Sequence, residues 1–167
     1  MILKFNLKNH FEAALSILLL SLGYFILIAL FKFDIGIIMI VSIAFSLFVL
    51  PGIYLHIEYW LINKNEKYII EQDSVTQIKN DIKEAYYLND IKKVVVYGSA
   101  TLFKPWPHLS AMEQYHFARV FLKNGEALTI TCLLTPRVDK SLEILKGVAF
   151  KKKKGLFNSA LLFNQKV

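Results

Sequence analysis

The hydrophobic pattern divides the chain into a continuous apolar part and an alternating part. Residues Ala13–Phe31 contain no charge, and Ile35–Tyr54 form a second uncharged run of similar length. At about 1.5 Å per residue, each run reaches across the roughly 30 Å hydrocarbon core of a bilayer. Backbone groups in hydrocarbon must bond within their own segment. The pattern therefore predicts transmembrane helices at about 13–31 and 35–53, with Pro51 ending or bending the second.

The connection between the two runs fixes their relative direction. Only Lys32-Phe33-Asp34 and their neighbours are free to turn, so the helices form an antiparallel hairpin within residues 1–54. Lysines flank the outer ends of this hairpin: Lys4, Lys8, Lys64 and Lys67. The positive-inside bias then predicts an integral protein of the inner (cytoplasmic) membrane, with both termini in the cytoplasm.

Two other interpretations of the apolar runs stay open. A signal peptide would share Lys4 and Lys8, but its apolar core would be too long, and no small-residue cleavage site follows. A buried soluble hairpin would need more protein around it than this chain offers. Small residues such as Ser42 and Ser46 indicate close helix packing, within the hairpin or in an oligomer.

Beyond Tyr54, apolar and polar residues alternate with the period of a β-strand. Asn124-Gly125 between two β-rich runs is a strong hairpin signal. The stripe of Val138, Leu142 and Leu145 predicts an amphipathic helix over 137–146, which ends at Gly147. The predicted strands are Leu55–Ile62, Lys67–Glu71, Val75–Lys79, Ile82–Tyr87, Lys92–Tyr97, Tyr115–Leu122 and Ala127–Leu134.

This order of elements predicts a membrane-anchored α+β protein. Residues 55–150 would form a small antiparallel barrel or bent sheet, capped by the helix over 137–146. Gly98–Met112 would be a long loop, because Pro105-Trp106-Pro107 cannot pair as a central strand. Residues 151–167 would form a basic and apolar tail.

Three short motifs add a family resemblance. The segment Tyr87–Ile91, the Asn124-Gly125 hairpin and the Leu133–Pro136 exit into a helix follow a transmembrane hairpin. This layout, over roughly 8–147, resembles the bacterial pleckstrin-homology-like (PH-like) membrane proteins of the YcxB-like group. The resemblance implies a seven-stranded PH-type barrel but no particular activity. Asn63–Tyr68 lacks the basic motif of phosphoinositide-binding PH domains, so phosphoinositide recognition is not implied.

Composition and charge agree with a membrane protein. The chain is 55% hydrophobic and carries a formal net charge of +7. Nearly all of that charge falls on residues 56–167, which suits the anionic inner leaflet. No reader helix or aromatic RNA platform accompanies the basic residues, so nucleic acid is not an expected partner. Cys132 is the single cysteine, which excludes an intrachain disulfide.

The candidate binding residues are basic and aromatic. Lys151, Lys152, Lys153 and Lys154 form a run followed by apolar residues, so they are either a membrane contact or a solvated segment. Trp106, held between two prolines near Lys104, is either an anchor for a partner or headgroups, or a cover over the barrel. Both features would serve binding rather than reaction.

The sequence offers no set of catalytic or metal-binding residues. The four histidines, His10, His56, His108 and His116, lack the spacing of a zinc site, and no metal or cofactor is expected. His56, His116 and Cys132 fall in strand patterns and are interpreted as packing residues. The main hypothesis is a non-catalytic, membrane-tethered module with a protein-binding or regulatory surface. An anionic-lipid sensor is the alternative, and a small membrane-bound enzyme is the third.

Overall fold

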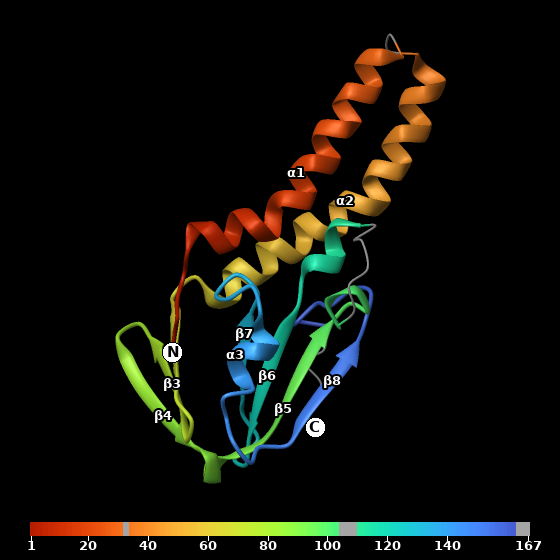
Figure 1. The fold of residues 1–167 in the computed structure, drawn as a ribbon. Helices are drawn as coiled ribbons and strands as arrows, with labels where there is room; N and C mark the ends of the chain where they lie inside the picture. The colour runs from red at the N-terminus through yellow and green to blue at the C-terminus, as the bar shows by residue number, and fades with distance from the viewer. Residues whose placement is uncertain (32–33, 104–109, 163–167) are drawn as a thin grey trace.

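Two long helices project from a body made of two β-sheets (Figure 1). The computed structural model describes residues 1–31, 34–103 and 110–162. Helix α1 spans Leu7–Leu30 and helix α2 spans Ile35–Asn63. Both helices change direction where they reach the sheets (Figure 1). The predicted helical hairpin is present, but each helix is longer than expected and its base belongs to the folded body.

The hairpin is an insertion between two neighbouring strands. Strand β1, Ile2–Leu3, precedes α1, and strand β2, Glu66–Ile70, follows α2. The two strands pair antiparallel, with Leu3 opposite Tyr68. The β domain therefore begins before the hairpin and is not confined to residues after 54. A strand of two residues carries too short a pattern to be recognised in the sequence.

The strand predicted over Leu55–Ile62 is wrong, because α2 continues to Asn63. The residues that face the interior are Leu55, Glu58 and Tyr59, which have helical spacing. Glu58 is polar and buried, and it obscured this spacing in the sequence. Pro51 bends the helix rather than ending it, since proline lacks the N–H that would bond to the carbonyl four residues earlier.

The first sheet has the strand order β1-β2-β3-β4 and is antiparallel throughout. Strand β3 spans Ser74–Lys79 and strand β4 spans Ile82–Tyr87. Asn80 and Asp81 join them with positive φ at both positions, as a two-residue hairpin turn requires. The short helix η1, Leu88–Asp90, then leads to the second sheet.

The second sheet has the order β7-β6-β5-β8. The Asn124-Gly125 hairpin is confirmed, since Gly125 has φ 93° and the Leu122 amide donates to the Glu126 carbonyl at 2.9 Å. The predicted tail is wrong in part, because residues 150–154 form a strand that pairs parallel with β5. The strands are β5, Ile91–Gly98; β6, Phe117–Leu122; β7, Ala127–Thr131; and β8, Phe150–Lys154. The short helix η2, Thr101–Phe103, lies in the predicted loop, and η3, Ala111–Gln114, begins at its end.

The two sheets do not close into the predicted barrel. The free edge of β7 is bound by the end of α2 instead of by another strand. The Asn63 side chain donates to the Thr129 carbonyl at 2.9 Å and accepts from the Thr131 amide at 3.0 Å. One side-chain amide thus takes the place of a neighbouring strand, which leaves the sheets as separate layers.

Helix α3, Val138–Leu142, is shorter than the helix predicted over 137–146. Its predicted apolar stripe is confirmed, because Val138, Leu142 and Leu145 are all buried. Gly147 has a positive φ of 84°, but it lies beyond the end of α3, whose C-cap is Glu143, so it does not stop the helix as predicted. The helix lies against β5 and β6.

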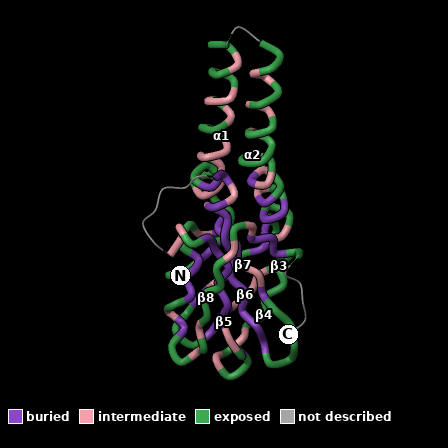
Figure 2. The backbone as a smooth tube through the Cα atoms, turned by 90° about the vertical axis from the view of Figure 1, so that its right-hand side faces the viewer, coloured by how far each residue is buried: buried purple, intermediate pink, exposed green. Residues whose placement is uncertain are grey.

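The core lies between the sheets and the helix bases (Figure 2). The upper hairpin contrasts with this core, because its residues are exposed or intermediate (Figure 2). Both helices are long and apolar enough to cross a membrane. In their most apolar stretches, none of α1 and 11% of α2 is buried. The core is built around large side chains: Leu55, Tyr59, Tyr68, Tyr115, Phe117, Ile130, Leu133 and Leu142.

Candidate binding site

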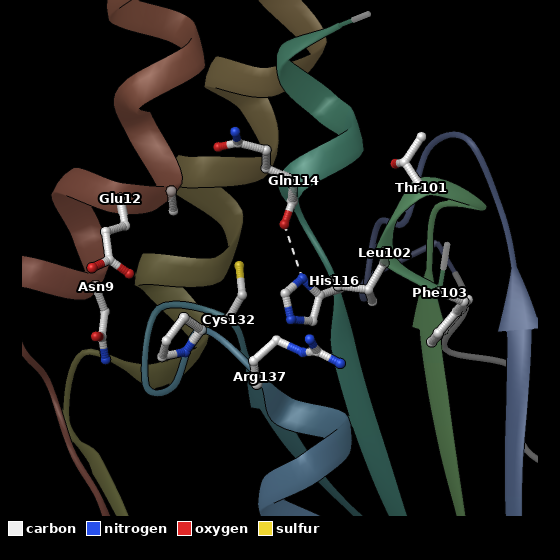
Figure 3. Close-up of a pocket in the computed structure, with 11 residues that line it drawn as sticks. Asn9, Glu12, Thr101, Leu102, Phe103, Gln114, His116, Cys132 and Arg137 are labelled. Atoms are coloured by element: carbon white, nitrogen blue, oxygen red, sulfur yellow. Dashed lines mark hydrogen bonds between the residues drawn. The ribbon is translucent and has the colours of Figure 1, made fainter. Parts of the chain in front are cut away.

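A pocket of about 560 Å³ lies where the base of the hairpin meets the sheets (Figure 3). One wall comes from the first turns of α1, and the others come from the ends of strands and the short helices. Its lining residues are Asn9, Glu12, Ala13, Thr101, Leu102, Phe103, Gln114, His116, Cys132, Pro136 and Arg137. Neither the hairpin nor the sheets alone would make this pocket.

The His116 ring stands in the middle of the lining residues (Figure 3). The side chain is only 3% exposed, and its Nδ1 lies 2.9 Å from the Gln114 carbonyl oxygen. A carbonyl only accepts, so Nδ1 carries the hydrogen and Nε2 of the neutral ring is an acceptor. Nε2 has no hydrogen-bond partner among the described residues. Nε2 is itself buried, so a donor group of a ligand would reach it only after neighbouring side chains move.

Burial keeps the His116 ring neutral. Desolvation lowers its pKa below the usual 6.5, and the Arg137 charge acts in the same direction. The Gln114 and Pro136 carbonyls and the Asp139 carboxylate oppose this shift without reversing it. The His116 ring in the pocket lining is therefore uncharged at neutral pH.

Cys132 is the other reactive group in the pocket. Its side chain is 3% exposed, and burial raises the pKa of the thiol to about 12. A nucleophilic cysteine must be a thiolate, and this thiol keeps its proton at neutral pH. Cys132 and His116 thus share a pocket without forming an activated pair. The interpretation of Cys132 as a small buried packing residue agrees with this burial.

Arg137 lines the pocket and connects it to a charge network, which we call the rim. Arg137 donates from Nε and Nη2 to the two carboxylate oxygens of Asp139, each at 3.1 Å. Lys152 Nζ lies 3.6 Å from Asp139 Oδ2 and 3.3 Å from Glu143 Oε1. Burial of Asp139 opposes its ionisation, but the hydrogen bonds from Arg137 and the Lys140 backbone hold the carboxyl pKa below its usual range. The rim is therefore nearly balanced in charge and would not attract a simple anion strongly.

All four lysines of the predicted basic run are exposed on the outer strand β8, and two of them also make contacts within the chain. Lys152 is held by the rim, and Lys153 Nζ lies 5.4 Å from the Tyr97 ring centroid. Lys151 and Lys154 are exposed on the outer strand of the sheet. Lysines on an edge strand also prevent pairing with another chain. The other two predicted residues, Lys104 and Trp106, lie outside the described residues.

Comparison with known proteins agrees with the β fold. The sequence matches the PH-domain family over residues 3–140, which is more than half of the chain and includes the hairpin. The chain therefore belongs to the PH-domain family. No curated protein and no solved structure matches it. PH-like domains are generally binding modules without catalytic activity, which directs attention to the pocket as a place for binding.

Sequence reasoning missed most of this pocket. His116 and Cys132 were noted but interpreted as packing residues, and Asn9, Glu12 and Gln114 drew no attention. No local signal joins them, because they come from segments far apart in the chain. Over residues 1–31, 34–103 and 110–162, no group of three or more His, Cys, Asp and Glu side chains could hold a metal ion.

Proposed function

We propose that this chain is a non-catalytic, membrane-tethered PH-like module that presents a protein-binding or regulatory surface at the cytoplasmic face of the inner membrane. The observation that carries the proposal is an apolar helical hairpin, exposed over its upper part, inserted into a PH-family domain. Exposed apolar helices of this length are stable in lipid and unfavourable in water. Both ends of the hairpin return to the β domain, so the domain stays at one membrane face.

The pocket at the hairpin base is the proposed binding surface. A partner that enters it would contact α1 and the second sheet together. The apolar side chains of Leu102, Phe103 and Pro136 supply the remaining contact area. The protonated Cys132 thiol and the neutral His116 ring favour binding over covalent chemistry.

Site-specific photocrosslinking in intact cells tests this proposal. A photoreactive phenylalanine analogue replaces Phe103 in the pocket, and a matched variant carries it at Tyr87. Tyr87 is the last residue of β4, which runs away from the hairpin in Figure 1. A discrete protein adduct from position 103 that is absent from position 87 supports the proposal. Identical products from both positions, or none from position 103, count against it.

Recognition of anionic lipid by the basic strand is the second candidate. Lys151 and Lys154 are exposed, and β8 runs toward the hairpin end of the molecule (Figure 1). Each basic residue near an anionic surface contributes about 1 kcal/mol at low screening. The full chain and its K151E/K154E variant would be compared in bilayers of anionic and of neutral lipid, with proteolytic protection of the β domain as the readout. Protection that needs both the lysines and the anionic lipid favours this candidate.

A further inference from the structure

Exposed apolar side chains continue along α2 below its bend at Pro51. Tyr54, Ile57 and Leu61 are spaced by three and four residues, so they share one helical face. Ile57 and Leu61 are 52% and 53% exposed, and the neighbouring Trp60 is 42% exposed. The opposite face of the same segment packs into the core through Leu55 and Tyr59. This stripe is therefore an outward surface that the described chain leaves about half exposed.

The C-terminal segment widens this stripe into a broader surface. The Phe157 and Tyr54 rings stack with centroids 5.8 Å apart, and the Leu161 amide donates to Glu58 Oε1 at 2.9 Å. The Tyr59 hydroxyl donates to the Asn158 carbonyl at 2.5 Å. Leu156, Leu161 and Leu162 remain 62%, 58% and 68% exposed beside the helix. The apolar shelf is defined by these residues: Tyr54, Ile57, Trp60, Leu61, Leu156, Leu161 and Leu162.

The position of the shelf along α2 matches the edge of a bilayer. Twenty residues, from Ile35 to Tyr54, extend about 30 Å as a helix, which is the thickness of the hydrocarbon core. Tyr54 then lies at the hydrocarbon boundary when the hairpin is inserted. Ile57 to Leu61 follow within about 5 to 10 Å along the helix axis, at the depth of the headgroup layer.

The chemistry of the shelf also suits that depth. Tyr and Trp are enriched at membrane interfaces, where their rings meet both acyl chains and headgroups. Lys64 Nζ lies 5.2 Å from the Trp60 ring centroid, one turn further from the hairpin. The nearest acid, Glu58, is 3% exposed and turns inward to the Leu161 amide, so its carboxylate does not face lipid. The order from aromatic to basic residues follows the order from acyl chains to anionic headgroups.

We infer that the apolar shelf is embedded in the boundary between headgroups and acyl chains of the cytoplasmic leaflet. The inference rests on the proposed insertion of the hairpin. It adds that the β domain is seated on the membrane in one orientation instead of hanging from two helices. The bilayer is the occupant because the shelf is continuous with the exposed apolar face of the hairpin and lies within headgroup depth. Burial of the shelf against a second copy of the chain is the competing outcome.

Fluorescence of Trp60 tests the inference in the full chain. The sequence has two tryptophans, so a Trp106→Phe variant leaves Trp60 as the only one. The variant is reconstituted in phosphatidylcholine–phosphatidylglycerol vesicles. Quenching of its Trp60 fluorescence is then measured with two quenchers: lipids brominated near the headgroup end of the acyl chain, and aqueous acrylamide. We expect strong quenching by the brominated lipid and weak quenching by acrylamide. Weak quenching by the brominated lipid overturns the inference, whether acrylamide reaches Trp60 or a second copy shields it.

A pair of variants and an extraction assay separate this inference from the proposed tether. L161D/L162D should raise acrylamide quenching of Trp60 several-fold, whereas Y87D, at a residue 60% exposed, should leave it unchanged. Equal quenching in the two variants contradicts the inference. Extraction of the intact chain by alkaline carbonate would overturn the tether, and the shelf with it. A chain that resists carbonate but has a water-accessible Trp60 overturns the shelf alone.

Discussion

The two halves of α2 belong to one continuous helix but have different surroundings. Above Pro51, side chains such as Ile40 and Leu47 are exposed around most of the helix. Below Pro51, Leu55 and Tyr59 are completely buried against the sheets. The difference teaches that one continuous helix can serve two environments. The upper half has Ser42 and Ser46 as its polar side chains, whereas ionisable and amide side chains, His56, Glu58 and Asn63, occur only in the lower half near the core.

A Leu55→Ala substitution should have the largest effect on stability. Leu55 is 0% exposed, and removing a buried leucine side chain costs about 2 to 5 kcal/mol through lost burial and a residual cavity. The matched control is Leu47→Ala in the upper half, where the side chain is 64% exposed. Chemical unfolding of the β domain, followed in one detergent for both variants, measures the difference. Equal losses would contradict the contrast between the two halves.

Asn63→Ala should rank next. Asn63 is 2% exposed and satisfies the Thr129 carbonyl and the Thr131 amide at the free edge of β7. Removing it leaves the buried Thr131 amide without this partner, whereas the Thr129 carbonyl still accepts from the Tyr68 hydroxyl at 3.3 Å. We expect a net loss of about 1 to 3 kcal/mol. Asn65→Ala, two residues later and exposed, is the control and should change the unfolding midpoint little.

Much of the β fold could be predicted from the sequence because its signals are local. The Asn124-Gly125 turn and the alternation over Ile82–Tyr87 gave both hairpins nearly at their observed bounds. The barrel prediction was wrong because Asn63 occupies the free edge of β7, and this contact joins residues far apart in the chain. The strand prediction over Leu55–Ile62 was wrong because the buried Glu58 interrupts the helical pattern of apolar residues, and a chance alternation resembled a strand.

The candidate site was less predictable than the fold. His116 and Cys132 are brought together by strand ends, and α1 covers them only because it begins at Leu7 and not near Ala13. The basic run was visible in the sequence, but its pairing with β5 was not, because four consecutive lysines do not look like a strand. The contact between Lys152 and Asp139 therefore could not be predicted from the sequence.

Gly52→Ala tests the junction between the two halves. A Cβ at Gly52 would lie 2.8 Å from the Ala111 Cβ, so η3 would have to move away from α2. Helix propensity favours alanine by up to about 1 kcal/mol, and overpacking costs about 1 to 3 kcal/mol. We expect a net loss of about 1 kcal/mol in the unfolding assay. Gly23→Ala in the upper half has nothing within 4 Å and should be neutral or slightly stabilising.

The smallest expected effect is a pH dependence of stability that arises from His116. This residue lies in the β domain, against which the lower half of α2 packs. Burial lowers the folded-state pKa of His116 below the 6.5 of the unfolded chain. Between these two pKa values the unfolded chain binds more protons, so stability falls as the pH drops below about 6.5 and levels off below the folded pKa. The pKa of Asp139 is below 3.8, so its contribution is lost only in stronger acid.

Comparison with a His116→Gln variant isolates this contribution from the other titrating groups. The difference in melting temperature between the two proteins should change between about pH 7.5 and pH 5.5, with the wild type losing more. Parallel melting curves over that range would mean that water reaches the His116 ring in the folded state. The interior beneath α2 would then be wetter than its packing indicates, and the contrast between the two halves of the helix would be weaker.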